Sequence, residues 1–471
     1  MLFNSIEFVI FLPIVFLLYW FVFNRNLRLQ NAFVLCASYV FYGWWNWRFL
    51  ILIAFTSLCS WTSGLIIEKY REDKRKAKIV NAMNIVVNLL ILGVFKYYNF
   101  FVHSFADVFL NGNSDGLLLN VALPVGISFY TFQALSYSID VYRGKLPATR
   151  DIVQFFAFVS FFPQLVAGPI ERATNLLPQF SKQRIVNYEQ LTNGLRQALW
   201  GLFKKMVIAD NLAVYVNLVY NDVENYSGFP LIWATLFFAF QIYADFSGYS
   251  DIAIGVAKMF GFSLMTNFRQ PYMSRSIKEF WNRWHISLSS WFRDYVYIPL
   301  GGNRVSYVRH CFNLIITFTI SGLWHGANWT FVIWGLYYGI LLVIEKIIGI
   351  KTIKTDTEFN FRQTLRVGVT FLLVVLGWSL FRANSLSDVG YIISHFAVFN
   401  SGIIGVPLVS EKTFVLLLLL IMLLFFVDFG KVISNNVKFW KLWYYIVVSL
   451  MIIGIYIFGV FEEQSFIYFQ F

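Results

Sequence analysis

Charge is what this chain has least of. Only 13% of its 471 residues are Asp, Glu, Lys or Arg, whereas an average soluble domain carries about a quarter. No polar stretch is long enough to fold as a separate soluble domain. Because hydrophobic residues make up 58% of the chain and the mean hydropathy is +0.62, we predict a single integral membrane domain over residues 1–471.

Cysteine is scarce as well, and the common catalytic motifs are missing. Cys36, Cys59 and Cys311 lie in or beside apolar segments at unrelated spacings, which argues against a disulfide framework and a CxxC metal site. No HExxH, GxSxG or Walker-type motif occurs, so we expect no metal site. The first residues carry Glu7 but neither Lys nor Arg, and no A-x-A site follows, so we expect no cleaved signal peptide.

Apolar runs, in contrast, recur along the whole chain. A helix of about 20 apolar residues crosses the ~30 Å hydrocarbon core of a bilayer. We therefore predict an all-α polytopic membrane protein with about twelve crossings. Examples of these runs are Ile6–Phe23, Phe49–Ile67, Val121–Val141, Trp329–Ile348 and Trp443–Val460.

The net charge of +12 arises from Lys and Arg in short loops between apolar runs, as the positive-inside bias of membrane proteins requires. No soluble basic module exists that would bind nucleic acid. We place the basic stretches 68–78 and 269–309 inside the cell. The parts that we then expect outside are the N-terminus, Asn221–Asn225, the tip of the hairpin formed by residues 312–348, and Glu462-Glu463.

One apolar segment, Ile152–Ala167, has basic residues that read as inside at both of its ends. This pattern predicts a re-entrant hairpin, and its centre, Phe161–Pro169, contains the Pro and Gly needed to break a helix. Broken backbone at membrane depth is tolerated where it is buried in protein or lines a cavity. We expect the hairpin to line a cavity and count Gln164, at its centre, among the candidate site residues.

His325 is the first candidate for catalysis. It lies in Ser321-Gly-Leu-Trp-His-Gly-Ala-Asn-Trp329, at or below the tip of the outward hairpin. Ionisable side chains at membrane depth are costly and mark a site by default. A neutral imidazole can take a hydroxyl proton as that oxygen attacks an acyl carbonyl. A structural histidine bonded to a helix carbonyl is the alternative; the supporting candidates nearby are Ser321, Trp324 and Asn328.

His285 has a different context. Around it, aromatic and aliphatic residues recur at helical spacing from Phe280 to Tyr295, with polar residues on the other side. This pattern predicts one amphipathic helix in the cytoplasmic interface. There, His285 is either a site residue or merely an interfacial side chain that reaches toward water. The further candidates in this segment are Trp284, Arg293 and Asp294.

A third cluster follows an apolar run and contains Asp245, Tyr249 and Asp251. Carboxylates at the end of a span need partners, and the arginines of the next loop are the obvious ones. Gly248 permits a break in the helix at this point. These residues either orient a site or only tie helices together.

Two of these segments resemble a known family. Trp284-His-Ile-Ser-Leu-Ser-Ser-Trp-Phe-Arg-Asp-Tyr-Val-Tyr-Ile-Pro-Leu-Gly-Gly302 and the sequence Ser321–Gly335 are similar to the signature segments of the membrane-bound O-acyltransferase (MBOAT) superfamily. The likeness is strongest to the branch of the alginate O-acetylation membrane protein. It implies a ring of about 11–12 transmembrane helices, with re-entrant and interfacial helices, around a central funnel. Its signature region covers residues of about 240–345, with His325 as the essential histidine and His285 as the second one.

The resemblance also implies a function. An acetyl group would pass from cytoplasmic acetyl-CoA, or from another acyl thioester, across a bacterial inner membrane. A periplasmic SGNH-type partner would then complete O-acetylation of a polysaccharide such as alginate, another exopolysaccharide or peptidoglycan. No tightly bound cofactor is expected. Transfer of D-alanine from a carrier protein to teichoic acid remains an alternative within the family, and a transporter without chemistry remains one outside it.

Overall fold

The computed structural model describes residues 1–114, 116–166, 168–350, 361–399, 402, 404–433, 440–461 and 466–467. For residues 428–433 and 440–446 the description covers the backbone alone. Every regular element within these ranges is a helix, which confirms the all-α prediction for the described chain. The predicted outer tail Glu462-Glu463 lies outside the described residues.

The chain forms two compact units. One contains residues 1–198 and 250–265, and the other contains residues 199–249 and 266–471. Helices α10 (Tyr188–Phe203) and α12 (Phe229–Met259) each contribute residues to both units. The single domain over residues 1–471 stays a prediction.

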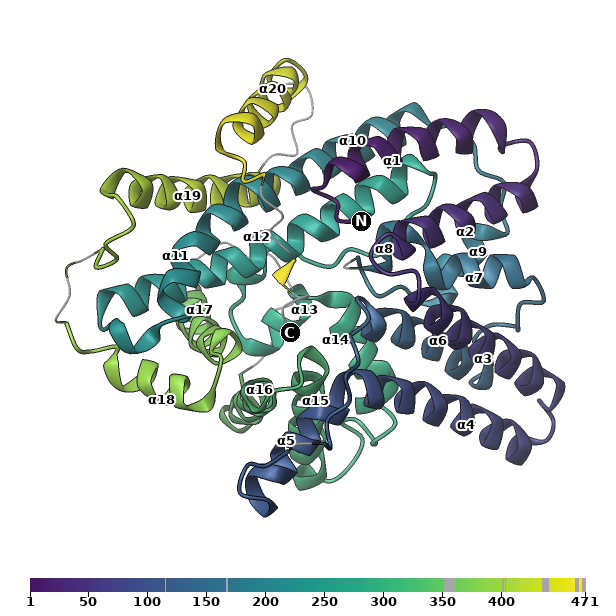
Figure 1. Ribbon diagram of the computed structural model, residues 1–471, viewed down its shortest axis with the longest axis horizontal. Coiled ribbons are helices and arrows are strands. Elements are labelled where there is room, and N and C mark those ends of the chain that lie inside the picture. The colour runs from purple at the N-terminus through teal and green to yellow at the C-terminus, as the bar shows by residue number, and fades with distance from the viewer. Residues whose placement is uncertain are drawn as a thin grey trace. The chain divides into compact units, whose positions relative to one another are not determined.

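The first unit holds the N-terminal helices (Figure 1). The run predicted at Ile6–Phe23 is helical from Ile6 to Val22, and its crossing of the membrane stays a prediction, whereas the run predicted at Val121–Val141 becomes helical only at Ile127. The reason is local, because Pro124 and the left-handed Gly126 (φ +73°) precede the helix. The helices are α1 (Ile6–Leu17), η1 (Leu18–Val22), α2 (Leu27–Gly43), α3 (Phe49–Lys69), α4 (Lys74–Leu92), η2 (Gly93–Tyr97), α5 (Tyr98–Phe109), α6 (Ile127–Tyr142), α7 (Ile152–Ser160), α8 (Phe162–Leu165) and α9 (Ala173–Phe180).

Buried polar side chains join three helices of this unit. Asn84 of α4 contacts Ser60 of α3 at 3.3 Å and donates to Ser138 of α6 at 2.8 Å. Such hydrogen bonds between helices contribute about 0.6–2 kcal/mol each in a membrane protein. They fix the position of α3, α4 and α6 relative to one another, which apolar side chains alone would not specify.

The segment predicted as a re-entrant hairpin is broken where expected. Helix α7 ends at Ser160, and α8 begins after the extended Phe161 (ψ 107°). Gln164 of α8 is buried and donates to the carbonyl of Phe158 at 3.2 Å, and Gln133 of α6 donates to the same carbonyl at 2.6 Å. The break is therefore held by side-chain amides, and its entry into the membrane stays a prediction.

The second unit contains the later helices. The span predicted at Trp329–Ile348 is α16, with the same bounds. The helices are η3 (Lys204–Ala209), α11 (Asp210–Tyr220), η4 (Val223–Asn225), η5 (Pro271–Met273), α13 (Ile277–Arg283), α14 (Ile286–Phe292), η6 (Arg293–Tyr297), α15 (Tyr307–His325), α16, α17 (Phe361–Arg382), α18 (Leu386–His395), α19 (Glu411–Ile433) and α20 (Trp440–Phe458).

Helices α15 and α16 form a closely packed hairpin (Figure 1). A Cβ atom built on Gly335 of α16 would lie 2.3 Å from the carbonyl oxygen of Phe318 in α15. One built on Gly322 would lie 2.2 Å from the carbonyl oxygen of Phe331. Small residues at these positions let the two backbones approach, as is common between membrane helices.

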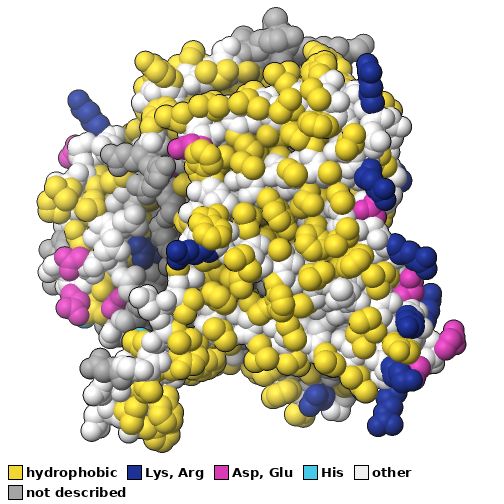
Figure 2. Space-filling view, turned by 45° about the vertical axis from the view of Figure 1, so that its right-hand side comes forward, with side chains coloured by type: hydrophobic (Ala, Val, Ile, Leu, Met, Phe, Trp, Pro, Cys, Tyr) yellow, Lys and Arg dark blue, Asp and Glu magenta, His cyan; other side chains and the backbone are white. Residues whose placement is uncertain are grey.

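Five helical stretches of the described chain are long and apolar enough to cross a membrane: Phe49–Lys69, Lys74–Phe109, Phe229–Met259, Trp329–Ile348 and Phe361–Arg382. Figure 2 shows hydrophobic side chains spread widely over the surface that it draws. A surface of this kind suits lipid and not water. The protein is thus a multi-pass membrane protein, as predicted, while about twelve crossings and the ring remain predictions.

Within the second unit, contacts join loops that the charge pattern places on the same side of the membrane. Arg382 donates to Asn221, and Asn328 donates to the carbonyl of Asn384, which joins two segments that we placed outside. At the other end of α16, Glu345 accepts hydrogen bonds from the backbone amides of residues 277 and 278, in the loop that we placed inside. The contacts agree with the topology that the charges predict.

Candidate active site

The segment around His285 differs from its prediction. Instead of one amphipathic helix, α13 ends at Arg283 and α14 begins at Ile286, with His285 between them in the left-handed region (φ 42°, ψ 52°). Asn267 holds this break open. Its backbone carbonyl accepts from the amide of Ile286 at 2.9 Å, and its side-chain oxygen accepts from the Ser287 amide at 3.2 Å and hydroxyl at 2.9 Å.

His285 is fully buried, which excludes the alternative of an interfacial side chain that reaches toward water. Phe246 of α12 packs against its ring with centroids 4.6 Å apart. Burial lowers the pKa of His285 from 6.5 to about 3, and the imidazole is therefore neutral at physiological pH. Nδ1 lies 3.1 Å from the side-chain oxygen of Asn267 and must donate to it, which leaves the lone pair on Nε2.

His325 ends helix α15 and is 3% exposed. Its ring lies 5.0 Å from that of Trp334 and 5.5 Å from that of Phe381, measured between centroids. The decisive distance is to the other histidine. The rings of His285 and His325 are 6.4 Å apart, although 40 positions separate them in the sequence.

The turn after His325 is built from residues that the sequence singled out. Asn328 caps α16, because its side-chain oxygen accepts from the Thr330 amide at 3.0 Å. Its Nδ2 donates to the carbonyl of Asn384 at 3.1 Å. Ser321 is buried one turn before His325 and hence on the same side of α15.

Aromatic residues enclose both histidines. Trp324 lies 5.1 Å from the His325 ring and 6.1 Å from the His285 ring. Trp284 packs 4.8 Å from Trp378, a residue of α17 that sequence reasoning missed. Phe246, Asn267 and Phe381 were missed too, because they lie outside the two signature segments; Trp334 falls within the second one and could have been found there.

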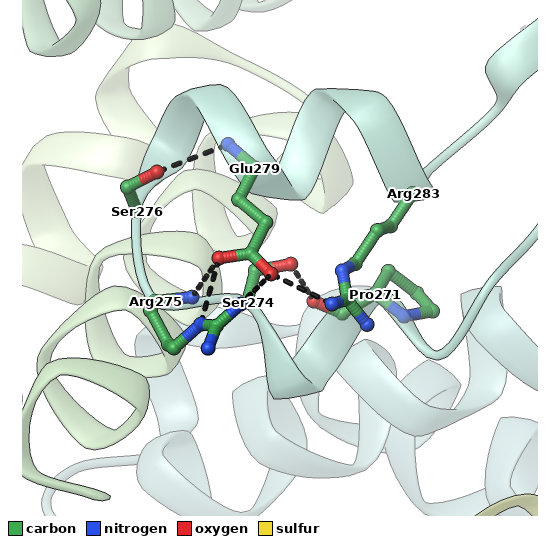
Figure 3. Close-up of polar contacts among 6 residues, drawn as sticks. All are labelled: Pro271, Ser274, Arg275, Ser276, Glu279 and Arg283. Atoms are coloured by element: carbon green, nitrogen blue, oxygen red, sulfur yellow. Dashed lines mark hydrogen bonds and ion pairs between the residues drawn. The ribbon is translucent and has the colours of Figure 1, made fainter. Parts of the chain in front are cut away.

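A buried ion network fixes α13, the helix that leads to His285 (Figure 3). Glu279 accepts from Arg275 at 3.1 Å and from Arg283 at 2.7 Å, and its amide donates to the cap Ser276. Burial by itself raises the pKa of Glu279, but the hydrogen bonds from Arg275 and the charge of Arg283 together lower it below 4.5. The carboxylate thus stays ionised and ties both ends of α13 together.

The same helix is tied to α16. Glu345, near the C-terminal end of α16, accepts from the amides of Ile277 and Lys278 at 2.5 and 3.1 Å. A carboxylate at this position satisfies two of the free N–H groups at the start of α13. Since α13 precedes His285 and α16 follows His325, this contact links the two histidine segments.

The arginine partner predicted for Asp245 is wrong. Asp245 pairs with Lys205 of η3 at 2.8 Å, and Lys205 also pairs with Asp210 at 2.8 Å, so a lysine takes the place of the expected arginines at Asp245. Asp251 accepts from Gln197 at 2.7 Å and belongs to the other unit. Six residues along an α-helix correspond to a rotation of about 240°, so the two carboxylates of α12 face different surroundings.

Gly248 does not break α12, which runs unbroken from Phe229 to Met259. The glycine serves close packing instead, because a Cβ atom there would lie 2.8 Å from the carbonyl oxygen of Gly201. Tyr249 is buried beside Lys205, whose Nζ lies 5.9 Å from the centre of its ring.

Three further candidates have contacts of their own. Arg293 and Asp294 pair with each other at 2.8 Å, and the Arg293 side chain is 62% exposed. Gln164 belongs to the first unit. Among the described residues, no group of three or more His, Cys, Asp or Glu is placed to hold a metal ion.

Comparison with known proteins identifies the family. The model of the membrane-bound O-acyltransferase family matches residues 39–387. The chain belongs to this family. The resemblance drawn from the two signature segments is thereby confirmed, and this MBOAT protein is an O-acyltransferase.

Three curated relatives of this MBOAT protein differ in their named activities. The probable alginate O-acetylase AlgI of Pseudomonas aeruginosa is 43% identical over 388 residues, 82% of this chain and 73% of that protein. The peptidoglycan O-acetyltransferase of Helicobacter pylori is 36% identical and covers 82% and 78%. The teichoic acid D-alanyltransferase of Streptococcus thermophilus is 31% identical and covers 62% and 77%.

Proposed function

We propose that this protein passes an acetyl group from cytoplasmic acetyl-CoA to the outer side of a bacterial inner membrane, for O-acetylation of a polysaccharide. The observation that carries the proposal is the pair of buried histidines, whose rings are 6.4 Å apart within an aromatic shell. Histidine is the commonest general base in proteins. The higher identity to the O-acetylating relatives than to the D-alanyl transferase supports acetyl as the acyl group.

The proposed chemistry uses His325 as the base. Its neutral imidazole takes the proton from the acceptor hydroxyl while that oxygen attacks the thioester carbonyl. The carbon–sulfur bond then breaks, and the thiolate of coenzyme A leaves with a proton returned by the imidazolium. Such a base contributes about 10²–10⁴-fold to the rate. The enclosing rings exclude water, which would otherwise hydrolyse the thioester.

His285 has a supporting role in this scheme. Its Nδ1–H is held by Asn267, so the lone pair of Nε2 is the group that it offers to the site. Because its imidazole stays neutral, it adds no positive charge beside His325 and leaves that residue able to accept a proton. We further propose that a periplasmic SGNH-type partner receives the acetyl group and delivers it to the polysaccharide.

The test uses purified protein in lipid vesicles with acetyl-CoA labelled in the acetyl group. Wild type should consume the thioester and transfer label to a periplasmic fraction. His325→Ala should abolish transfer, and His285→Ala should reduce it strongly. His103→Ala is the matched control, since His103 is an exposed histidine of α5 in the other unit.

Two outcomes would contradict the proposal. Normal transfer by a folded His325→Ala variant would remove that residue from the chemistry. If wild type ignores acetyl-CoA but accepts D-alanine from a loaded carrier protein, the acyl group is D-alanine and the acceptor is of the teichoic acid type.

A further inference from the structure

The aromatic shell around His325 contains hydrogen-bond donors as well as apolar surface. Trp334 of α16 is 1% exposed, and its ring stands at 84° to the His325 ring with the centroids 5.0 Å apart. Its buried Nε1–H has no acceptor among the described residues. Buried indole N–H groups usually have a partner, because an unsatisfied donor in the interior costs free energy. A phenylalanine would fill the same space without that cost.

Thr330 supplies a second donor on the same side of α16. It lies one turn before Trp334, and residues four apart on a helix are neighbours. Thr330 is 1% exposed, and its hydroxyl has no partner in the described chain, although its backbone amide donates to Asn328. It belongs to the first turn of the helix, where the helix dipole favours negative charge. Two buried donors thus share the face of α16 on which Trp334 contacts His325.

Other tryptophans of this unit also have indole N–H groups without an acceptor among the described residues, but their settings differ. The side chains of Trp200 and Trp233 are only half-buried. Trp281 is buried, and its ring packs 5.7 Å from that of Trp334. Of these four residues, Trp334 is the one whose ring contacts His325.

The packing of α16 against α15 fixes the position of these donors. Gly335 follows Trp334 and lets α16 approach α15 so closely that a Cβ atom there would lie 2.3 Å from the carbonyl oxygen of Phe318. His325 is the last residue of α15. The donors and the base are therefore held on two helices in close contact. Donors that are positioned before the reaction stabilise charge that develops in the transition state, often as the largest single contribution to catalysis.

We propose that Trp334 and Thr330 form an oxyanion hole, in which Nε1–H and Oγ1–H donate hydrogen bonds to the carbonyl oxygen of the acyl thioester. When the acceptor hydroxyl attacks, its proton passes to His325 and the electron pair of the carbonyl π bond moves to that oxygen. The two donors stabilise the negative charge until the carbon–oxygen double bond re-forms and the thiolate leaves. This inference rests on the proposed function, because it assumes that His325 acts at a thioester carbonyl.

The experiment measures steady-state kinetics of the full chain in lipid vesicles. Trp334→Phe keeps an aromatic ring without the N–H group, and Thr330→Val keeps the shape of the side chain without the hydroxyl. Loss of one oxyanion-hole donor lowers kcat about 10²–10³-fold. Trp334→Phe should therefore lower kcat about 10²-fold or more at a nearly unchanged KM for the acyl donor. Thr330→Val should lower kcat about tenfold, because a freely rotating hydroxyl is less well oriented.

Trp233→Phe is the matched control for the loss of an indole N–H. The ring of Trp233 packs 5.8 Å from Phe237 and 5.2 Å from Phe414, and its N–H group likewise has no acceptor in the described chain. This variant should keep the wild-type kcat and KM. Melting temperatures of all variants establish that they are folded.

An infrared spectrum tests the hydrogen bond without turnover. The probe is acetonyl-CoA, isotopically labelled at its ketone carbonyl, in which a methylene group between sulfur and carbonyl prevents cleavage. A hydrogen bond to the carbonyl oxygen lowers its stretching frequency. The bound probe should thus absorb at lower frequency in wild type than in Trp334→Phe, and Trp233→Phe should match wild type.

The proposal is overturned if folded Trp334→Phe keeps the wild-type kcat or carbonyl frequency, if Trp233→Phe loses as much, or if the whole loss lies in KM. If Trp334→Phe does not fold, Thr330→Val takes its place, and wild-type values for that variant overturn the proposal. If wild type transfers D-alanine and not acetyl, the variants are compared with the carrier-bound thioester, which presents the same carbonyl. Normal turnover by His325→Ala beside a loss in Trp334→Phe would contradict the proposed base alone.

Discussion

His285 is positioned by its backbone as well as by its ring. The left-handed conformation costs a non-glycine residue roughly 1–2 kcal/mol, and histidine and asparagine adopt it more readily than most other residues. Hydrogen bonds from the neighbouring residues to Asn267 offset that cost. The break places the imidazole among aromatic rings, where a continuous helix would have directed it elsewhere.

The buried His285 should make the protein sensitive to acid. Its pKa is about 3 in the folded protein and 6.5 ordinarily, so below pH 6.5 the unfolded chain takes up a proton that the folded one does not. Stability should therefore be complete above pH 6.5 and decline as the pH falls, by up to about 1.4 kcal/mol per pH unit. His285→Asn, which keeps the left-handed backbone, should remove this component from melting temperatures measured between pH 7.5 and 4.5. Equal slopes for variant and wild type would refute it; His103→Ala should follow wild type.

Glu171 should act in the opposite direction. It is fully buried, and burial raises its pKa from 4.5 to about 7, although Asn175 donates to it at 2.7 Å. Between these values the folded protein retains a proton that the unfolded chain loses, so stability should fall as the pH rises from about 4.5 to 7. Glu171→Gln should abolish this decline in melting temperature. A wild-type curve parallel to that of the variant would show that the carboxyl is already ionised when folded.

At the scale of elements, the α15–α16 hairpin sets the position of His325. Its two helices approach through glycines, and no neighbouring side chain can move to make room, because the atoms in the way belong to the backbone. The position of His325 thus depends on a glycine in each helix, Gly322 in α15 and Gly335 in α16.

Gly335→Ala should therefore damage both stability and activity. The added methyl would lie 2.3 Å from the Phe318 carbonyl oxygen, and overpacking of this kind costs about 1–3 kcal/mol. Melting temperature and acyl transfer should both fall. Gly368→Ala in α17 is the matched control, because nothing lies within 4 Å of a Cβ atom there; it should match or slightly exceed wild type. Equal effects of both substitutions would show that the close approach is unimportant.

Two helical segments show what the local sequence pattern can predict and what it cannot. The predicted run at Trp329–Ile348 matches α16 at both ends, since Asn328 caps it and Gly349 ends it in the left-handed region. The amphipathic helix predicted from Phe280 to Tyr295 is broken in the structure, but the face predicted to be apolar is the buried one. Trp281, Leu288 and Trp291 are buried, as that pattern requires. The periodicity of apolar residues predicts which face of a helix is buried. It does not predict a break caused by one residue in the left-handed region.

At the scale of the whole molecule, orientation in the membrane follows from the loops. At one end of α16, Arg382 contacts Asn221 in a loop predicted outside the cell. At the other end, Glu345 contacts the loop predicted inside. These contacts support the relative sides of the loops, and the basic residues supply the absolute direction.

Cysteine labelling should establish that direction. In a background where the three native cysteines are serine, Asn225→Cys should react with a membrane-impermeant maleimide on intact cells. Lys278→Cys should react only after permeabilisation; both positions are exposed in the structure. The reverse pattern would invert the topology, and with it the side from which the acceptor arrives.

The sequence by itself determined the membrane class, the all-α class and the two segments that carry the histidines. Each of these depends on local features: the length of apolar runs, the placement of basic residues, helix caps, and the sequences of two short signature segments. Only the tertiary structure decided what surrounds the histidines and how close they lie. Asn267, Phe246, Trp378 and Phe381 come from segments distant in the chain, and hydrogen bonds and ring contacts between such segments leave no periodic trace in the sequence.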